Sequence, residues 1–150
     1  MKYFGKLLAA AVIILTLMPA AKGQGKSVYL EGHDDYQYSV KEIRVHPGEK
    51  VTITLKTISS MSKSEMAHNW VLLKMGVNAT AFTNQGMTHK DNEYIDPKLE
   101  DQIIAHTKLL GNGEQDSITF TAPKAKGEYT YVCTFPGHYL LGMKGKFIVE

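Results

Sequence analysis

Short segments in which apolar and polar residues alternate are the feature that most constrains the fold of this chain. In Val51–Leu55 the apolar residues alternate with threonine, and Asp116–Thr121 and Tyr129–Cys133 show the same period of two. Such alternation is typical of strands with one buried face and one face in solvent. Turn residues such as Gly111–Gly113 separate the segments. The sequence therefore predicts an all-β sandwich.

The remaining segments place one irregular region inside this sandwich. Val77–Leu110 does not alternate and holds an acidic stretch with Pro97, so we expect it to pack as a flap with a short helix. No internal repeat or linker interrupts the chain, which indicates a single domain. The expected strands are Ser27–Glu31, Tyr38–Val45, Lys50–Lys56, a segment around His68–Lys74, Asp116–Thr121, Tyr129–Cys133 and Lys144–Val149.

The first 23 residues have a different character. Lys2 and Lys6 precede an apolar run, Leu7–Met18, and small residues follow it as far as Gly23. This is the layout of a secretory signal. The run of about 12 residues is shorter than the roughly 20 that a membrane-spanning helix needs, which favours cleavage near Gly23 over an uncleaved tether. We therefore expect a signal at 1–23 and an exported domain at 24–150 with no membrane span, periplasmic if the source is a Gram-negative bacterium.

Charge excludes one class of partner. The chain has a formal charge of +2, and removing Lys2, Lys6 and Lys22 with the signal leaves about −1. The remaining lysines are scattered and form no basic stripe that could neutralise a phosphate backbone. We expect no nucleic-acid partner.

Cys133 is the only cysteine, so an exported form of this chain has no internal disulfide. The thiol is therefore inert in the core, paired with another chain, or bound to a metal as a thiolate. A lone cysteine is most often inert. The neighbouring residues favour the third role here.

Cys133, His138 and Met143 bring a thiolate, an imidazole and a thioether onto one stretch of eleven residues. Two histidines and one cysteine with a weak axial methionine are the ligands of electron-transfer copper sites. The second histidine must come from elsewhere, and His68 is best placed because it begins an apolar segment. The other histidines are expected to be surface or packing residues; they are His33, His46, His89 and His106.

Four stretches of the chain resemble azurins, which belong to the cupredoxin family of blue copper proteins. The resemblance covers about residues 66–150, whereas Ser27–Lys63 fits less well and lacks the disulfide cysteines. Gly142 lengthens the segment between His138 and Met143 by one residue, as in auracyanin and rusticyanin. The matching stretches are Ala67–Leu72, Ile104–Leu109, Gly113–Ser117 and Cys133–His138.

This resemblance implies a cupredoxin-type Greek-key β-sandwich that holds one copper ion. The carbonyl of Ala67 would be a possible further weak axial group, and Asn69 and Phe135 would hold the loop and donate hydrogen bonds to the cysteine sulfur. The implied metal ligands are His68, Cys133 and His138 in the equatorial plane and Met143 on the axis.

The expected function is one-electron transfer by Cu(I)/Cu(II) cycling, without enzymatic activity. The electron would leave through an exposed edge of His138, on an apolar patch that suits weak, transient docking. Partners would be redox proteins such as c-type cytochromes, reductases or oxidases, and the carrier would be a monomer. Copper delivery or storage is the alternative, and an open catalytic copper site or a purely structural Ig-like domain is less favoured. The patch comprises Pro136, Tyr139, Leu140 and Leu141.

Overall fold

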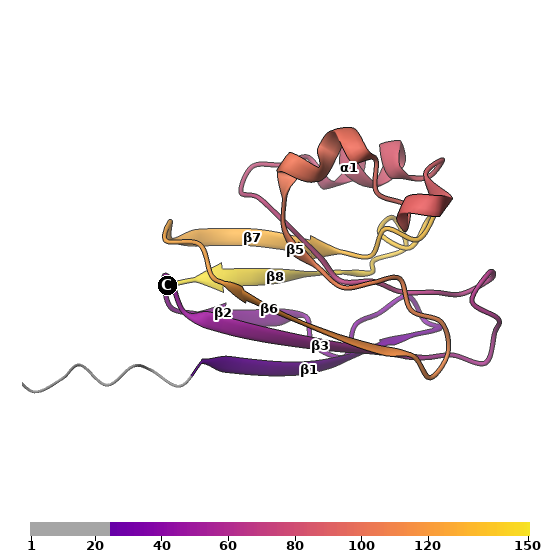
Figure 1. The fold of residues 1–150 in the computed structure, drawn as a ribbon, viewed down its shortest axis with the longest axis horizontal. Helices are drawn as coiled ribbons and strands as arrows, with labels where there is room; N and C mark the ends of the chain where they lie inside the picture. Colours follow the sequence, from indigo (N-terminus) through magenta and orange to yellow (C-terminus); the bar gives the residue numbers. More distant parts are fainter. Residues whose placement is uncertain (1–24) are drawn as a thin grey trace, which may run out of the picture.

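Two β-sheets pack face to face in the computed structural model, which describes residues 25–150 (Figure 1). The predicted signal at 1–23 lies outside the described residues. The first sheet has the order β1 (Lys26–His33), β3 (Lys50–Ile58), β6 (Gln115–Thr121). The second has the order β2 (Glu42–Val45), β8 (Lys144–Val149), β7 (Gly127–Val132), β4 (Val71–Leu73), β5 (Ile103–His106).

The predicted Greek-key sandwich is confirmed, and strand β3 shows how alternation builds it. Val51, Ile53 and Leu55 are fully buried in the core between the sheets. On the other face of β3, the hydroxyl groups of Thr52 and Thr119 lie 2.8 Å apart across the β3–β6 pair. The sequence alternation therefore separates a buried face from a polar face.

Strand β4 is covered on both faces, because a flap lies against the outer face of the second sheet (Figure 1). Val71 and Leu73 pack with Phe82 of helix α1 (Ala79–Gly86), whereas Leu72 and Trp70 enter the core between the sheets. This arrangement explains the uninterrupted apolar run at this point of the sequence.

The flap consists of α1, two short 3-10 helices, η1 (Lys90–Asn92) and η2 (Pro97–Gln102), and the edge strand β5. The expected short helix is confirmed. Strand β5 was not expected, because four residues at a sheet edge carry little alternation. Within residues 25–150, which the structure describes, no helix is long and apolar enough to cross a membrane.

Two strand predictions were too long. The Tyr38–Val45 segment is a strand only at Glu42–Val45, and Tyr38 forms an isolated bridge with Gly32. His68 precedes β4 and pairs with Leu110 in another isolated bridge. In both places the residues outside the strand pair only through an isolated bridge.

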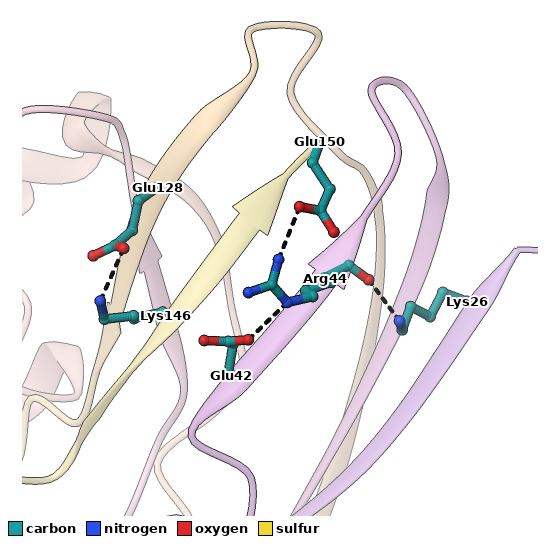
Figure 2. Close-up of polar contacts among 6 residues, drawn as sticks. All are labelled: Lys26, Glu42, Arg44, Glu128, Lys146 and Glu150. Carbon is teal, nitrogen blue, oxygen red and sulfur yellow. Dashed lines mark hydrogen bonds and ion pairs between the residues drawn. The ribbon is translucent and has the colours of Figure 1, made fainter.

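Polar contacts join exposed side chains of neighbouring strands along β1, β2, β7 and β8 (Figure 2). The Arg44 guanidinium contacts the carboxylates of Glu42 and Glu150, and Lys26 donates to the Arg44 carbonyl, which links β1 to β2. Lys146 pairs with Glu128 at 3.0 Å. About half of each paired side chain is exposed, so these ion pairs add little to stability and the apolar core supplies most of it.

Candidate metal centre

The Cys133–Met143 loop is closed by hydrogen bonds at its base. Cys133 directly follows β7 and Met143 directly precedes β8, and the Cys133 N–H donates to the Met143 carbonyl at 3.2 Å. The Met143 N–H donates in turn to the His138 carbonyl at 2.9 Å. The pairing of β7 with β8 therefore brings the three side chains of the loop to one end of the sandwich.

His68 reaches the same place from a distant part of the sequence. Its N–H donates to the Leu110 carbonyl at 2.9 Å, and the Leu110 N–H donates to the His68 carbonyl at 2.8 Å. Strand β4, which follows, pairs with β7 through Val71 and Val132. The backbone thus fixes His68 beside Cys133.

The three polar side chains converge on one point. The Cys133 Sγ atom lies 3.5 Å from Nδ1 of His138 and 4.0 Å from Nδ1 of His68. The potential ligand atoms of these three residues all lie within 4.8 Å of one another, and no other such group of histidine, cysteine or acidic residues occurs within residues 25–150. Cys133 and His68 are fully buried, and His138 is 3% exposed.

Met143 lies beside this cluster, and Gly32 of β1 makes room for it. The Met143 side chain is fully buried. A Cβ atom added at Gly32 would lie 3.0 Å from the Met143 methyl carbon and 2.9 Å from the His68 ring. Gly32 therefore allows a thioether and an imidazole to approach the same strand. Gly32 was not predicted to contribute to the site, because nothing in the sequence around it distinguishes it from other strand glycines.

Burial keeps all three polar groups neutral. Desolvation lowers the pKa of His68 to about 4, and the pKa of His138 also falls to about 4, mainly through desolvation and then through the nearby His68. Desolvation raises the pKa of the Cys133 thiol to about 12, although backbone N–H groups of Asn69 and Phe135 partly oppose this shift. Two neutral imidazoles can bind a metal without first losing a proton.

This donor set fits copper. A thiolate and two imidazoles suit copper in both of its oxidation states, and a buried thioether suits a weak axial position. A bound cation would favour the thiolate form of Cys133 against the burial that now disfavours it. The carbonyl oxygen of Ala67 lies 3.9 Å from the sulfur, in the region where a further weak ligand was expected.

Asn69 connects the His68 segment to the cysteine loop. Its side-chain oxygen accepts from the Thr134 N–H at 2.9 Å, and its Nδ2 group donates to the Thr134 hydroxyl at 2.7 Å. That hydroxyl donates to the Glu93 carbonyl of the flap at 2.8 Å. These buried bonds hold three separate segments together around the sulfur. The role expected for Asn69 in holding the loop thus has a structural basis.

The remaining histidines make their contacts outside the group around Cys133. His33 contacts Glu31 at 3.2 Å, His89 contacts Asp96 at 3.7 Å, and the ring of His106 faces the Thr107 carbonyl at 3.1 Å. His46 is exposed in the turn after β2. None of these four residues belongs to the group around Cys133.

The apolar patch is present, and His138 is the one of the four proposed donors that keeps some solvent exposure. Leu140 and Leu141 are 62% and 57% exposed, and Met87 lines a small hollow beside Leu140. The His138 ring itself is 3% exposed, because the rings of Phe135 and Tyr36 lie against it.

Comparison with known proteins agrees with this site. The sequence model of copper binding proteins of the plastocyanin/azurin family matches residues 25–150. Azurin-1 from Alcaligenes xylosoxydans xylosoxydans is 44% identical over 79% of this chain and 93% of its own length. Azurin from Pseudomonas aeruginosa is 39% identical over 94% of this chain and 97% of its own. Auracyanin A, a blue copper protein from Chloroflexus aurantiacus, superimposes with a TM-score of 0.75 at 33% identity, over 85% of this chain and 100% of its own.

The fold and the donor set together define a cupredoxin that uses a single type 1 copper ion. The chain belongs to the plastocyanin/azurin family of copper-binding proteins and is a blue copper electron-transfer protein. The match from residue 25 onward corrects the expectation that the resemblance is confined to about residues 66–150. The strands before residue 66 resemble the family less in sequence, because a β-strand depends on the alternation of apolar and polar residues rather than on particular residue types.

The lowered pKa values of His68 and His138 predict acid sensitivity of the metal-free protein. Below the ordinary value of 6.5 the unfolded chain takes up protons that the native state takes up only near pH 4. The free energy of unfolding should therefore fall as the pH falls from about 6.5 to about 4, by on the order of 3 kcal/mol per histidine.

Urea unfolding across this pH range measures the effect. The double variant His68→Gln/His138→Gln should show a much shallower fall, and the control His46→Gln, which changes an exposed turn residue, should keep the full fall. An unchanged fall in the double variant would contradict the assignment.

Proposed function

We propose that His68, Cys133 and His138 bind one copper ion, with Met143 as a weak axial ligand, and that the protein shuttles single electrons between redox partners. The observation that carries this proposal is the convergence of both Nδ1 atoms on the buried Cys133 sulfur. The thioether of Met143 is buried beside them.

When bound, copper supplies a centre that accepts and releases one electron between Cu(II) and Cu(I). The chain supplies the donors from positions fixed by strand pairing and by the bonds of Asn69, so their geometry changes little between oxidation states. Close packing around the donors leaves no open position for a substrate, since none of them is more than 3% exposed. These features support an electron carrier rather than an enzyme.

The surface beside His138 supports transient docking. Leu140 and Leu141 are exposed apolar side chains on the ligand loop itself, so a partner that covers them would approach the site closely. A small apolar contact gives the fast dissociation that a shuttle needs. The proposed partners are redox proteins such as c-type cytochromes, reductases or oxidases, with the carrier acting as a monomer.

Replacement of the thiol tests the central assignment. Protein loaded with Cu(II) should show the intense visible absorption of a copper thiolate, and Cys133→Ser should lose it, because an alcohol cannot replace the soft sulfur donor. His106→Gln, which changes an exposed histidine outside the group, should keep the band.

Visible and electron paramagnetic spectra measure this outcome. If wild-type protein lacks the band, the proposal fails. A colourless protein that binds only Cu(I) would support copper delivery instead.

Met143 should tune the site without being essential to it. We expect Met143→Leu to retain copper and the visible band, but to shift the reduction potential upward, because loss of a weak donor destabilises Cu(II) more than Cu(I). Voltammetry measures the shift. Met61→Leu makes the same change at an exposed methionine and should leave the potential unchanged. Equal potentials in wild type and Met143→Leu would exclude an axial role.

We also propose that the protein is exported after removal of residues 1–23. The charged start, short apolar run and small residues before Gln24 support this. N-terminal sequencing of protein recovered from the exported fraction should begin near Gln24. An intact Met1 in that fraction would indicate an uncleaved tether.

A further inference from the structure

The turn that follows β1 packs against the ligand loop. The His33 N–H donates to the Gln37 carbonyl and the Tyr36 N–H donates to the His33 carbonyl, both at 3.1 Å. The same turn reaches Gly142, where an added Cβ atom would lie 3.2 Å from Nε2 of Gln37. A segment far from the cysteine loop in sequence therefore forms one wall of the site.

Tyr36 occupies an uncommon backbone conformation in this turn. Its φ angle is +60°, in the left-handed region that aromatic residues rarely adopt. Strained backbone of this kind persists where surrounding contacts hold it, and it is often found at functional sites. The Tyr36 ring packs against the main core and also contacts a proposed ligand, edge-to-face against His138 with centroids 5.1 Å apart and planes at 67°.

His138 is buried although neighbouring residues of the same loop are exposed. Within the same loop, Leu140 and Leu141 are more than half exposed, whereas His138 is 3% exposed. Besides the neighbouring His68 imidazole, two aromatic rings contact the imidazole of His138: Phe135 from the loop itself, at 4.6 Å between centroids, and Tyr36 from the turn after β1. Tyr36 and His68 are thus the ring contacts to His138 from outside the loop, and of these two only Tyr36 is not a proposed ligand.

We propose that Tyr36 is a positioning residue that closes the solvent side of His138 and so keeps water and small anions from the metal centre. The covering of His138 is a property of the protein alone, whereas its effect on copper rests on the proposed function. Exclusion of water lowers the local dielectric constant, which disfavours the more highly charged Cu(II) state. The Tyr36 ring therefore keeps the reduction potential higher than it would be with water beside His138.

Three variants separate the ring from the turn. Tyr36→Gly removes the ring, and glycine adopts a φ angle of +60° without steric cost, so the turn is retained. Tyr36→Phe keeps the ring and removes only the hydroxyl. Asp35→Asn changes an exposed side chain of the same turn, keeps the oxygen that accepts from the Gln37 N–H, and serves as the control.

The metal-free protein gives the first readout, through the rate at which diethyl pyrocarbonate modifies His138, resolved by peptide mass mapping. We expect the rate to rise at least about tenfold in Tyr36→Gly, as an opened site requires, and to match wild type in Tyr36→Phe and Asp35→Asn. His68 is the internal reference, because it is fully buried against Gly32 on another side of the site. An unchanged rate at His138, or an equal rise at His68, would overturn the proposal.

The copper-loaded protein gives the second readout. Azide should shift the visible spectrum of Tyr36→Gly but not of Tyr36→Phe or wild type, and the potential of Tyr36→Gly should be lower than that of wild type. No azide response together with an unchanged potential would overturn the role of Tyr36 at the metal. Absence of the thiolate band in every variant would instead reject the proposed function, while the rate of His138 modification would still decide whether Tyr36 covers the ring.

Discussion

Antiparallel pairing of β7 with its two neighbours is the constraint on which the rest of the site depends. The register of β7 with β8 places Val132 opposite Lys144, so Cys133 and Met143 face each other directly beyond the paired strands. The register of β7 with β4 places Val132 opposite Val71, and the chain before β4 then passes the sulfur at His68. A shift of one residue in either register would turn a donor to the opposite face of the sheet.

The site combines polar donors with an environment that disfavours their charged forms. Burial alone would hold Cys133 as a thiol and both imidazoles as neutral rings. With a metal bound, Cys133 would hold it as a thiolate, and its proton would leave to solvent. Buried polar groups that conflict with local folding preferences are expected at functional sites, and this cluster is such a place.

The surroundings of the donors divide into a rigid side and an accessible side. Asn69 and Thr134 fasten the loop to the flap on the inner side through buried hydrogen bonds. On the outer side, Leu140 and Leu141 face solvent from the same loop. The loop can therefore keep its donors fixed while it presents an apolar surface to a partner.

The residue pattern alone is enough to predict the fold class and the donors on the loop. Alternation requires two-faced strands, and the spacing of Cys133, His138 and Met143 keeps three donors close whatever the rest of the chain does. His68 was identified through its family-like surroundings, and the structure then placed it beside the sulfur.

The residues that pack against these donors are set by long-range contacts and follow from no local pattern. Strand β5 and the contacts of Gly32 and Tyr36 depend on segments remote in sequence, and no local pattern encodes such pairings. The burial of His138 has the same origin, since the Tyr36 ring that helps to cover it comes from the turn after β1. Local spacing fixes which donors can meet, whereas long-range packing fixes how far they are from water.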